Sequence, residues 1–229
     1  MTSLQKWGKS VRTTIPVMAG YLVLGAGFGI LLRTRGYGLG WALAMSAFIY
    51  AGSMQYVAID LLTGGASLLT TAVTTLLVNA RHLFYGISML ERYRAAGKYA
   101  PYLIFSLTDE TYSLVAARED LTGAECFRIS LLDQLYWVLG TALGSLAGAY
   151  LDFNTTGIDF SLTALFLTVF TEQWLETKDH APALIGLGVS IVCRLLFGAD
   201  SFLLPTMGGM LCCLLVLDVR RTKKGGESV

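Results

Sequence analysis

Polar side chains inside an otherwise apolar stretch are the groups of this sequence that could do chemistry. Asn79, Arg81 and His82 interrupt the apolar run of residues 66–90. An arginine at the centre of a membrane helix costs roughly 2.5–3.5 kcal/mol even on a lenient scale, so in a membrane Arg81 must pair or line an aqueous cavity. Its planar guanidinium, with Asn79 beside it, suits a substrate carboxylate; the alternative is a structural role against a neighbouring helix. His82 is either a hydrogen-bonded core residue or a protonation switch.

Two adjacent carboxyl groups form the second polar cluster. Asp109 and Glu110 lie within residues 99–117, which are otherwise mainly apolar. Because burial favours the neutral form of a carboxyl group, either residue could carry a proton. The alternative is a structural ion pair with Arg81 or Arg194. Neighbouring side chains on a helix point about 100° apart, so we expect that the two carboxyl groups do not face the same partner.

The composition excludes most soluble classes of protein. Of the 229 residues, 54% are hydrophobic and only 14% are charged, whereas a soluble domain carries about 25% charged residues. The formal net charge of +1 provides no basic excess for nucleic acid, and the large apolar fraction excludes disorder. Two histidines and four cysteines without a CxxC spacing indicate neither a zinc site nor another cofactor. What remains is a polytopic membrane protein.

The apolar segments of the sequence are long enough for membrane helices. A crossing needs roughly 20 mainly apolar residues, and the sequence lacks the sustained alternation of a membrane β-barrel. We therefore expect an all-α polytopic membrane protein that forms a single transporter domain over residues 1–229. About eight hydrophobic segments are expected, at residues 15–32, 38–62, 66–90, 99–117, 129–150, 160–175, 181–197 and 201–218.

The sequence resembles itself at an offset of about 115 residues. The matched pairs are residues 23–29 with 138–144 (VLGxxxG), 48–56 with 166–174 (F-x6-Q-aromatic) and 81–84 with 194–197 (R-x-L-F). Three matches in one order and at nearly one offset indicate gene duplication. We expect two repeats, at about residues 15–117 and 129–218, and internal repeats of this kind are typical of transporters.

The repeat adds further polar residues to the candidate site. Gln55 and Gln173 are repeat mates that could face each other across a symmetry axis and bind substrate, with Tyr56 beside them. The alternative is that these glutamines only join helices through hydrogen bonds. Arg194 is expected to form a structural polar pair with Glu172.

Glycines and two further acidic residues have structural interpretations. Gly25, Gly27 and Gly29 either form a packing face of small residues or an unwound stretch that offers backbone groups to a substrate. Asp60 and Asp133 lie near the ends of expected spans, where we expect solvated side chains.

The placement of charge predicts an orientation. Short cytoplasmic loops carry excess Lys and Arg, which places both termini in the cytoplasm. Eight full crossings would put the basic residues 33–35 and 92–98 outside. If the two VLGxxxG segments are broken or do not cross, residues 33–35 and 92–98 lie inside, and residues 63–65, 118–128 and 152–159 lie outside. The second repeat then begins on the opposite side, which makes the repeat inverted; the alternative is eight plain helices with a parallel repeat.

Three motifs resemble those of a known family. Residues 50–56 read YAGSMQY, residues 79–86 read NARHLFYG and residues 107–112 read LTDETY. In this order and spacing they are similar to the AzlC family, and the resemblance covers nearly the whole chain. It implies the large subunit of a bacterial inner-membrane exporter of branched-chain amino acids, with a small membrane subunit of the AzlD type as partner. The resemblance assigns no site residues to this sequence. The candidate residues above are therefore chosen only because their polar side chains lie in apolar segments that are expected to be buried.

The chemistry of the candidate residues suits an amino-acid substrate. A zwitterion needs a cation for its carboxylate, which Arg81 would supply, and acceptors for its ammonium group, which Asp109, Glu110 or Gln55 would supply. The sequence has no G-x-x-x-x-G-K-[ST] motif, so uphill export would be coupled to protons through Asp109, Glu110 or His82. Two other classes stay open: a membrane channel, and a membrane subunit that does not itself transport.

Overall fold

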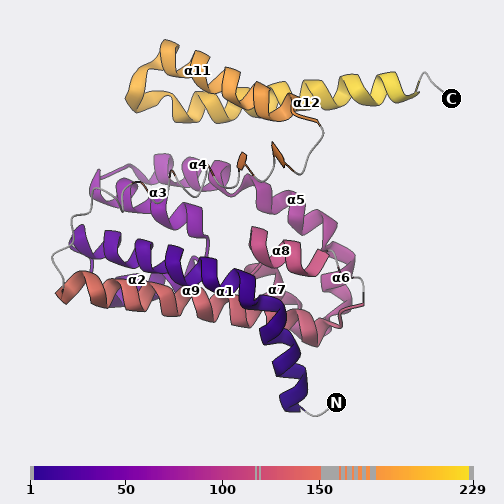
Figure 1. Ribbon diagram of the computed structural model, residues 1–229. Helices are drawn as coiled ribbons and strands as arrows, with labels where there is room; N and C mark the ends of the chain where they lie inside the picture. The colour runs from indigo at the N-terminus through magenta and orange to yellow at the C-terminus, as the bar shows by residue number, and fades with distance from the viewer. Residues whose placement is uncertain are drawn as a thin grey trace. The chain divides into compact units, whose positions relative to one another are not determined.

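All regular secondary structure in the described residues is helical, which confirms the all-α prediction (Figure 1). The computed structural model describes residues 3–116, 118, 120–150, 160, 163, 167, 170–171, 174–175 and 179–226. The chain divides into two compact units, residues 1–162 and 163–229, and each unit is described by itself. The single transporter domain expected over the whole chain stays a prediction.

The first unit contains helices of very different length. Their bounds are α1 Ser3–Thr34, α2 Leu39–Phe48, α3 Gly52–Thr63, α4 Leu68–Val78, α5 Ala80–Ser88, α6 Leu90–Ala95, α7 Ala100–Phe105, α8 Asp109–Ala116 and α9 Gly123–Tyr150, with a 3₁₀ turn at Gly97–Tyr99. Three of the expected crossings are interrupted, at residues 49–51, at Asn79 and at residues 106–108. Each interruption falls in or beside a polar motif of the sequence.

The two long helices pack backbone against backbone. A Cβ added at Gly25 of α1 would lie 2.8 Å from the carbonyl oxygen of Trp137, and one at Gly140 of α9 would lie 2.7 Å from that of Leu22. Only residues without a bulky side chain allow helices to approach so closely. The prediction that the VLGxxxG segments are broken is therefore wrong: they lie in continuous helices of 32 and 28 residues, and their glycines form the alternative packing face.

The helices α1 and α9 run in the same direction (Figure 1). Near their starts, Arg128 Nε donates to Ser10 Oγ at 3.4 Å. Toward their ends, Gly148 lies against Ile30, so contacts follow the same order along both helices. An inverted repeat would place its two equivalent segments antiparallel. The expected inversion is therefore wrong for this pair of segments, whose common direction agrees with a parallel repeat. The alternative prediction of eight plain helices is also wrong, because three of the expected crossing segments are interrupted.

One end of the first unit gathers basic loops. Lys9 Nζ lies 3.7 Å from Glu125 Oε1, and Arg92 Nη1 donates to the Val115 carbonyl oxygen at 2.6 Å. This end, called the basic end below, holds Lys6, Lys9, Arg12, Arg92, Arg94, Lys98, Arg118 and Arg128. Residues 118–128 therefore lie beside the start of α1. The prediction that these two stretches lie on opposite sides is wrong, because it rested on the first VLGxxxG segment not crossing, whereas that segment lies in a continuous helix.

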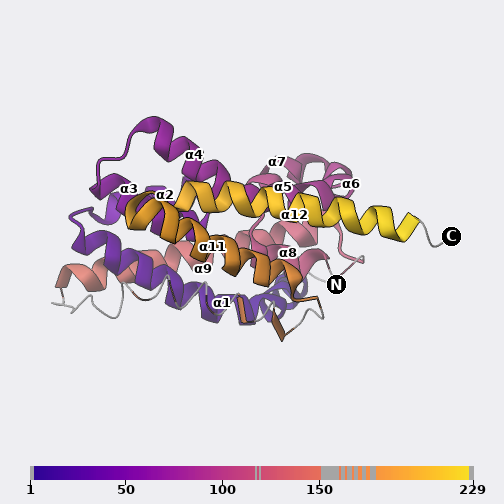
Figure 2. The same ribbon diagram turned by 90° about the horizontal axis from the view of Figure 1, so that it is seen from above.

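Two helical hairpins reach the middle of the first unit from opposite ends (Figures 1 and 2). The hairpin α2–α3 starts and finishes at the far end, which holds the loops at residues 35–38 and 63–67. The prediction that residues 33–35 and 63–65 lie on opposite sides is therefore wrong, because α2 and α3 form a hairpin and not one crossing helix. The hairpin α7–α8 starts and finishes at the basic end. At 1.5 Å per residue, the 12 residues of α3 extend only about 18 Å, against a hydrocarbon core of about 30 Å. The segments α4 and α5 together run from the far end to the basic end.

Two apolar clusters hold the hairpins against the long helices. The first contains Phe28, Tyr56 and Trp137 and joins α3 to α1 and α9. The second contains Leu103 and Ile129 among its members and joins the hairpin α7–α8 to α9. Burial of these side chains fixes the depth to which each hairpin tip reaches.

Among its described residues, the second unit contains the helices α11 Ala181–Ser201 and α12 Leu203–Gly226, which match the expected segments 181–197 and 201–218. α11 is kinked at Gly198, whose φ of +74° favours glycine. The helices pack closely where Gly209 meets Val189. By length and composition, Gln5–Thr34 of the first unit and Ala181–Gly198 of the second could span a membrane. Part of the expected segment 160–175 lies outside the described residues.

Candidate functional site

The tips of the two hairpins meet between α1 and α5. Tyr50, in the turn between α2 and α3, has a φ of +43°, and its ring centroid lies 6.4 Å from that of Phe105 at the end of α7. Tyr21 Oη of α1 lies 2.7 Å from Thr108 Oγ1 in the other tip. A positive φ at a bulky residue is strained, and such strain clusters at functional sites. The polar motifs of the sequence therefore come together in the middle of the unit.

An ion pair joins the first two polar clusters. Arg81 Nη1 of α5 contacts Asp109 Oδ2 of α8, and Arg81 Nη2 donates to Ser53 Oγ of α3 at 2.6 Å. The side chains of Arg81 and Asp109 keep 34% and 27% of their surface exposed, so the pair is reachable. The sequence left open whether Arg81 meets a protein carboxylate or a substrate; in this conformation its partner is Asp109.

Glu110 faces a different helix from its neighbour. Tyr21 Oη donates to Glu110 Oε2 at 2.6 Å, while Asp109 faces α5. The two carboxyl groups thus have separate partners, as expected from their angular separation on a helix. Glu110 belongs to the contact between α8 and α1.

A cavity opens at the break between α4 and α5, where its lining includes Asn79 and His82, the residues that flank Ala80 and Arg81 in the sequence. Its volume of about 540 Å³ lies within the roughly 300–1,000 Å³ of small-molecule sites. His82 and Asn79 contribute polar groups, and His82 Nδ1 lies 3.2 Å from the Asn79 carbonyl oxygen. Most of the wall is apolar, from residues that include Ile49, Leu83, Ile87, Ile104, Phe105 and Leu107. The cavity therefore suits a small ligand with one polar and one apolar part.

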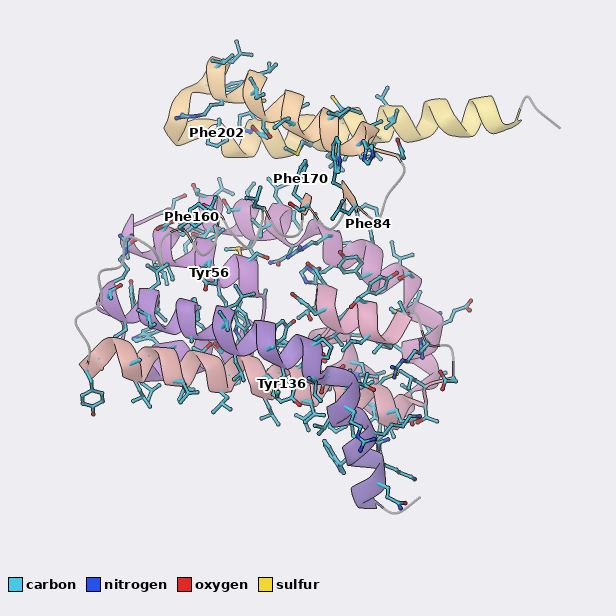
Figure 3. The ribbon with its side chains drawn as sticks, viewed as in Figure 1. Tyr56, Phe84, Tyr136, Phe160, Phe170 and Phe202 are labelled. Atoms are coloured by element: carbon cyan, nitrogen blue, oxygen red, sulfur yellow. The ribbon has the colours of Figure 1, made fainter. Side chains whose placement is uncertain are left out.

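Gln55 and Tyr56 lie in the core and not in this cavity. Trp137 Nε1 donates to Gln55 Oε1 at 2.8 Å, and the Gln55 amide donates to Ser46. Tyr56, which Figure 3 shows between α3 and α1, donates its hydroxyl to the Leu24 carbonyl oxygen at 2.7 Å. These contacts favour the alternative role of joining helices.

The candidates of the second repeat are only partly described. Gln173 and Glu172 lie outside the described residues, so both the pairing of Gln173 with Gln55 and that of Glu172 with Arg194 stay predictions. The guanidinium carbon of Arg194 lies 5.5 Å from the ring centroid of Phe202 in the second unit.

Asp133 is a site residue that the sequence interpretation missed. It was expected to be solvated at a span end, but its side chain is 0% exposed, and its Oδ2 lies 2.8 Å from Thr111 Oγ1. The expectation is wrong because α9 begins ten residues before Asp133, which therefore lies deep within the helix. Asp133 lies three residues after Ser130 and four residues before Trp137, and both of these residues are buried. This helical spacing is the sequence signal that could have indicated the burial of Asp133.

Comparison with known proteins finds similarity over most of the chain. The family model described as "AzlC protein" matches residues 16–151. The chain is 46% identical over 209 residues to the branched-chain amino acid transport protein AzlC of Bacillus subtilis (strain 168), covering 89% of this chain and 82% of that one. It is 42% identical over 216 residues to an uncharacterized membrane protein of Haemophilus influenzae, covering 92% and 87%. It is 26% identical over 222 residues to the inner membrane protein YgaZ of Escherichia coli, covering 90% and 87%. No solved structure matches the chain.

Proposed function

The chain belongs to the AzlC family of membrane proteins, and on that premise we propose that it exports branched-chain or similar hydrophobic amino acids across a bacterial inner membrane. It acts as a secondary transporter, coupled to protons, with a small membrane subunit of the AzlD type. A relative with 46% identity is named as a branched-chain amino acid transport protein, and this supports the substrate class.

The observation that carries the proposal is a reachable ion pair beside an apolar cavity. The pair of Arg81 and Asp109 has the same two charges as a zwitterionic amino acid, with opposite polarity. A substrate can therefore replace the internal contact: its carboxylate binds Arg81, and its ammonium group binds Asp109. The aliphatic side chain then enters the apolar cavity lined by Leu83 and Ile104. When the substrate replaces the internal ion pair with two new ion pairs, every charge stays compensated.

Asn79 and His82 belong to the same proposed site. They line the cavity where α4 ends and α5 begins. Asn79 Oδ1 is buried and has no hydrogen-bond partner. A free amide oxygen can accept a hydrogen bond from a substrate ammonium group. Gln55 and Tyr56 support the site indirectly, because they fix α3, which carries the Ser53 hydroxyl that contacts Arg81. Gln173 remains a candidate by its repeat relationship.

The distribution of charge supports an orientation in the membrane. The basic end carries eight Lys and Arg residues, so it faces the cytoplasm together with the N-terminus. Both short hairpins then enter the bilayer from opposite sides without crossing it, and their polar tips lie near its centre. Irregular backbone at this depth is tolerated where it lines a cavity. The basic residues of 220–224 support a cytoplasmic C-terminus as well.

Flux measurements on purified protein in liposomes test the proposal. We expect uptake of labelled valine to exceed equilibrium when a proton gradient is applied, and to stop at equilibrium without one. Glu110→Gln should abolish the uphill component while leaving exchange of valine, and Asp109→Asn should weaken both. Conductance without coupling would indicate a channel. Absence of both flux and valine binding, with the partner subunit also present, would indicate a subunit that does not transport.

A further inference from the structure

A continuous row of hydrogen-bonded hydroxyl groups joins two carboxyl groups inside the first unit. Tyr21 Oη lies 2.6 Å from Glu110 Oε2 and 2.7 Å from Thr108 Oγ1. Thr108 Oγ1 lies 3.1 Å from Thr111 Oγ1, which in turn lies 2.8 Å from Asp133 Oδ2. This row, called the hydroxyl chain below, thus contains four hydrogen bonds between Glu110 and Asp133.

The hydroxyl chain needs one more proton than its hydroxyl groups supply. Each hydroxyl has a single proton to donate, so Tyr21, Thr108 and Thr111 provide three protons for four bonds. If both carboxyl groups were ionised, Tyr21 would donate to Glu110 and Thr111 to Asp133. Thr108 could then donate to only one of its two hydroxyl neighbours, and one contact would bring two lone pairs together. A proton on either carboxyl group completes the chain.

Burial decides which carboxyl group holds that proton. Asp133 is 0% exposed, and its Oδ1 has no hydrogen-bond partner. The groups that face it are Thr111 and Glu110 of α8, Tyr50 of the α2–α3 turn and Tyr102 of α7, and none of them is a cation. A buried carboxylate with one neutral donor lacks the compensation that an ionised group requires. Glu110 is only half-buried and lies next to Asp109, whose partner is Arg81.

We propose that Asp133 and Glu110 share one proton through the hydroxyl chain, and that Asp133 holds it in this conformation. The transfer moves one proton from Asp133 to Glu110 and leaves each hydroxyl group of the chain with one proton. The Asp133 O–H bond breaks as its proton passes to Thr111, which passes its own proton to Thr108; Thr108 protonates Tyr21, and the Tyr21 proton forms the new O–H bond on Glu110. Asp133 is left as the carboxylate, now accepting from Thr111. Asp133 is thus an internal proton store for the substrate site.

This inference deepens the proposed proton coupling and rests on it for its role in transport, but its chemistry can be tested without transport. Infrared spectroscopy of the detergent-solubilised full chain at neutral pH should show the C=O band of a protonated carboxylic acid. The band should vanish in Asp133→Asn, whose amide can donate to Thr111 and so keep the chain complete. It should persist in Ser130→Ala, which removes a buried hydroxyl of the same helix, and in Asp60→Asn, which removes an exposed carboxyl group.

The route is tested by the rate at which this band shifts after transfer to D₂O. Thr111→Val removes the hydroxyl next to Asp133 with little change of shape, so we expect the shift to slow at least about tenfold. Thr111→Ser retains the hydroxyl and should restore the rate. A band that survives in Asp133→Asn, or its absence from the wild type at neutral pH, would overturn the shared proton. Equal rates in folded Thr111→Val and Thr111→Ser would overturn the route. Because none of these readouts uses flux, a failure of amino-acid transport would leave them unaffected.

Discussion

The guanidinium of Arg81 and the carboxylate of Asp109 join the start of α5 to the start of α8, although the two residues are 28 positions apart in the sequence. Arg81 lies two residues after the helix break at Asn79, and Asp109 directly follows the break at residues 106–108. The ion pair therefore connects a broken crossing segment to the tip of a hairpin. Its loss should affect both folding and substrate binding, and suitable variants separate the two effects.

Removing Arg81 should destabilise the protein through the carboxylate that is left behind. Breaking a fully buried pair costs about 3–5 kcal/mol, and since Asp109 is 27% exposed we expect a smaller loss of about 1–2 kcal/mol for Arg81→Ala. The double variant Arg81→Ala with Asp109→Asn should recover part of that loss. Thermal unfolding and monodisperse yield measure both. Arg81→Lys keeps the charge but not the planar fork, so it should fold normally and bind valine at least about tenfold more weakly. Unchanged affinity would exclude Arg81 as the carboxylate anchor.

Narrowing the cavity should change which amino acid is preferred. Gly86 lines the cavity, and a Cβ at this position would meet no atom within 4 Å. Gly86→Val should therefore lower the affinity for leucine and isoleucine more than that for alanine, by about tenfold or more, since one methylene group changes discrimination by about 10–200-fold. Competition against labelled valine measures the order of preference. Gly40→Val, where a Cβ also meets no atom within 4 Å, is the matched control. A parallel loss for all three amino acids would place the substrate elsewhere.

Adding one methyl group between α1 and α9 should disrupt the first unit. In Gly25→Ala the new Cβ would lie 2.8 Å from the Trp137 carbonyl oxygen, which belongs to backbone and cannot rotate away. Overpacking of this kind typically costs about 1–3 kcal/mol. The control is Gly20→Ala in the same helix, where the added group meets no atom within 4 Å. The thermal unfolding midpoint should fall for the first variant and stay unchanged for the second; equal midpoints would contradict the close approach.

The arrangement of loops predicts which positions a membrane-impermeant thiol reagent can reach in intact cells. With the four native cysteines replaced, Ala95→Cys and Asp120→Cys lie at the basic end and should be protected. Thr63→Cys lies at the far end and should be labelled from outside. Disruption of the cells should make all three positions reactive. Labelling of residue 120 in intact cells while residue 95 stays protected would contradict the parallel packing of α1 and α9.

The sequence predicted the polar clusters well because their cost in an apolar environment is visible in composition alone. The separate partners of Asp109 and Glu110 follow from helical geometry. The break of the helix at Asn79 was not predicted, because residues 66–90 were expected to form one crossing helix. Periodicity cannot reveal where an apolar segment turns back, however, because two half-helices of 10 and 12 residues have the same composition as one crossing helix. The turn at Tyr50 depends on packing against Phe105, which is distant in the sequence.

The direction of α9 and the burial of Asp133 depend on tertiary contacts in the same way. The expectation that the VLGxxxG segments do not cross placed residues 118–128 opposite the N-terminus, but the salt bridge of Lys9 with Glu125 and the contact of Gly25 with Trp137 hold the two helices side by side and parallel. A glycine pattern indicates that a helix packs closely, and it does not indicate against which helix or in which direction.

The backbone contact between α1 and α9 has a consequence for how the protein could move. Where α1 and α9 touch through glycines their backbones are in direct contact, and beside this contact Trp137 of α9 packs against Tyr21 and Phe28 of α1. Such close packing leaves little room for a displacement, so we expect the two helices to behave as one rigid frame. The elements that meet at the ion pair are short, and each begins or ends at an interruption where φ and ψ can change. Alternating access would then arise from rocking of the hairpin tips and of the segment α4–α5 against a stationary frame. In that case the hydroxyl of Tyr21, which is part of the frame, is the fixed point past which the moving carboxylates of α8 travel.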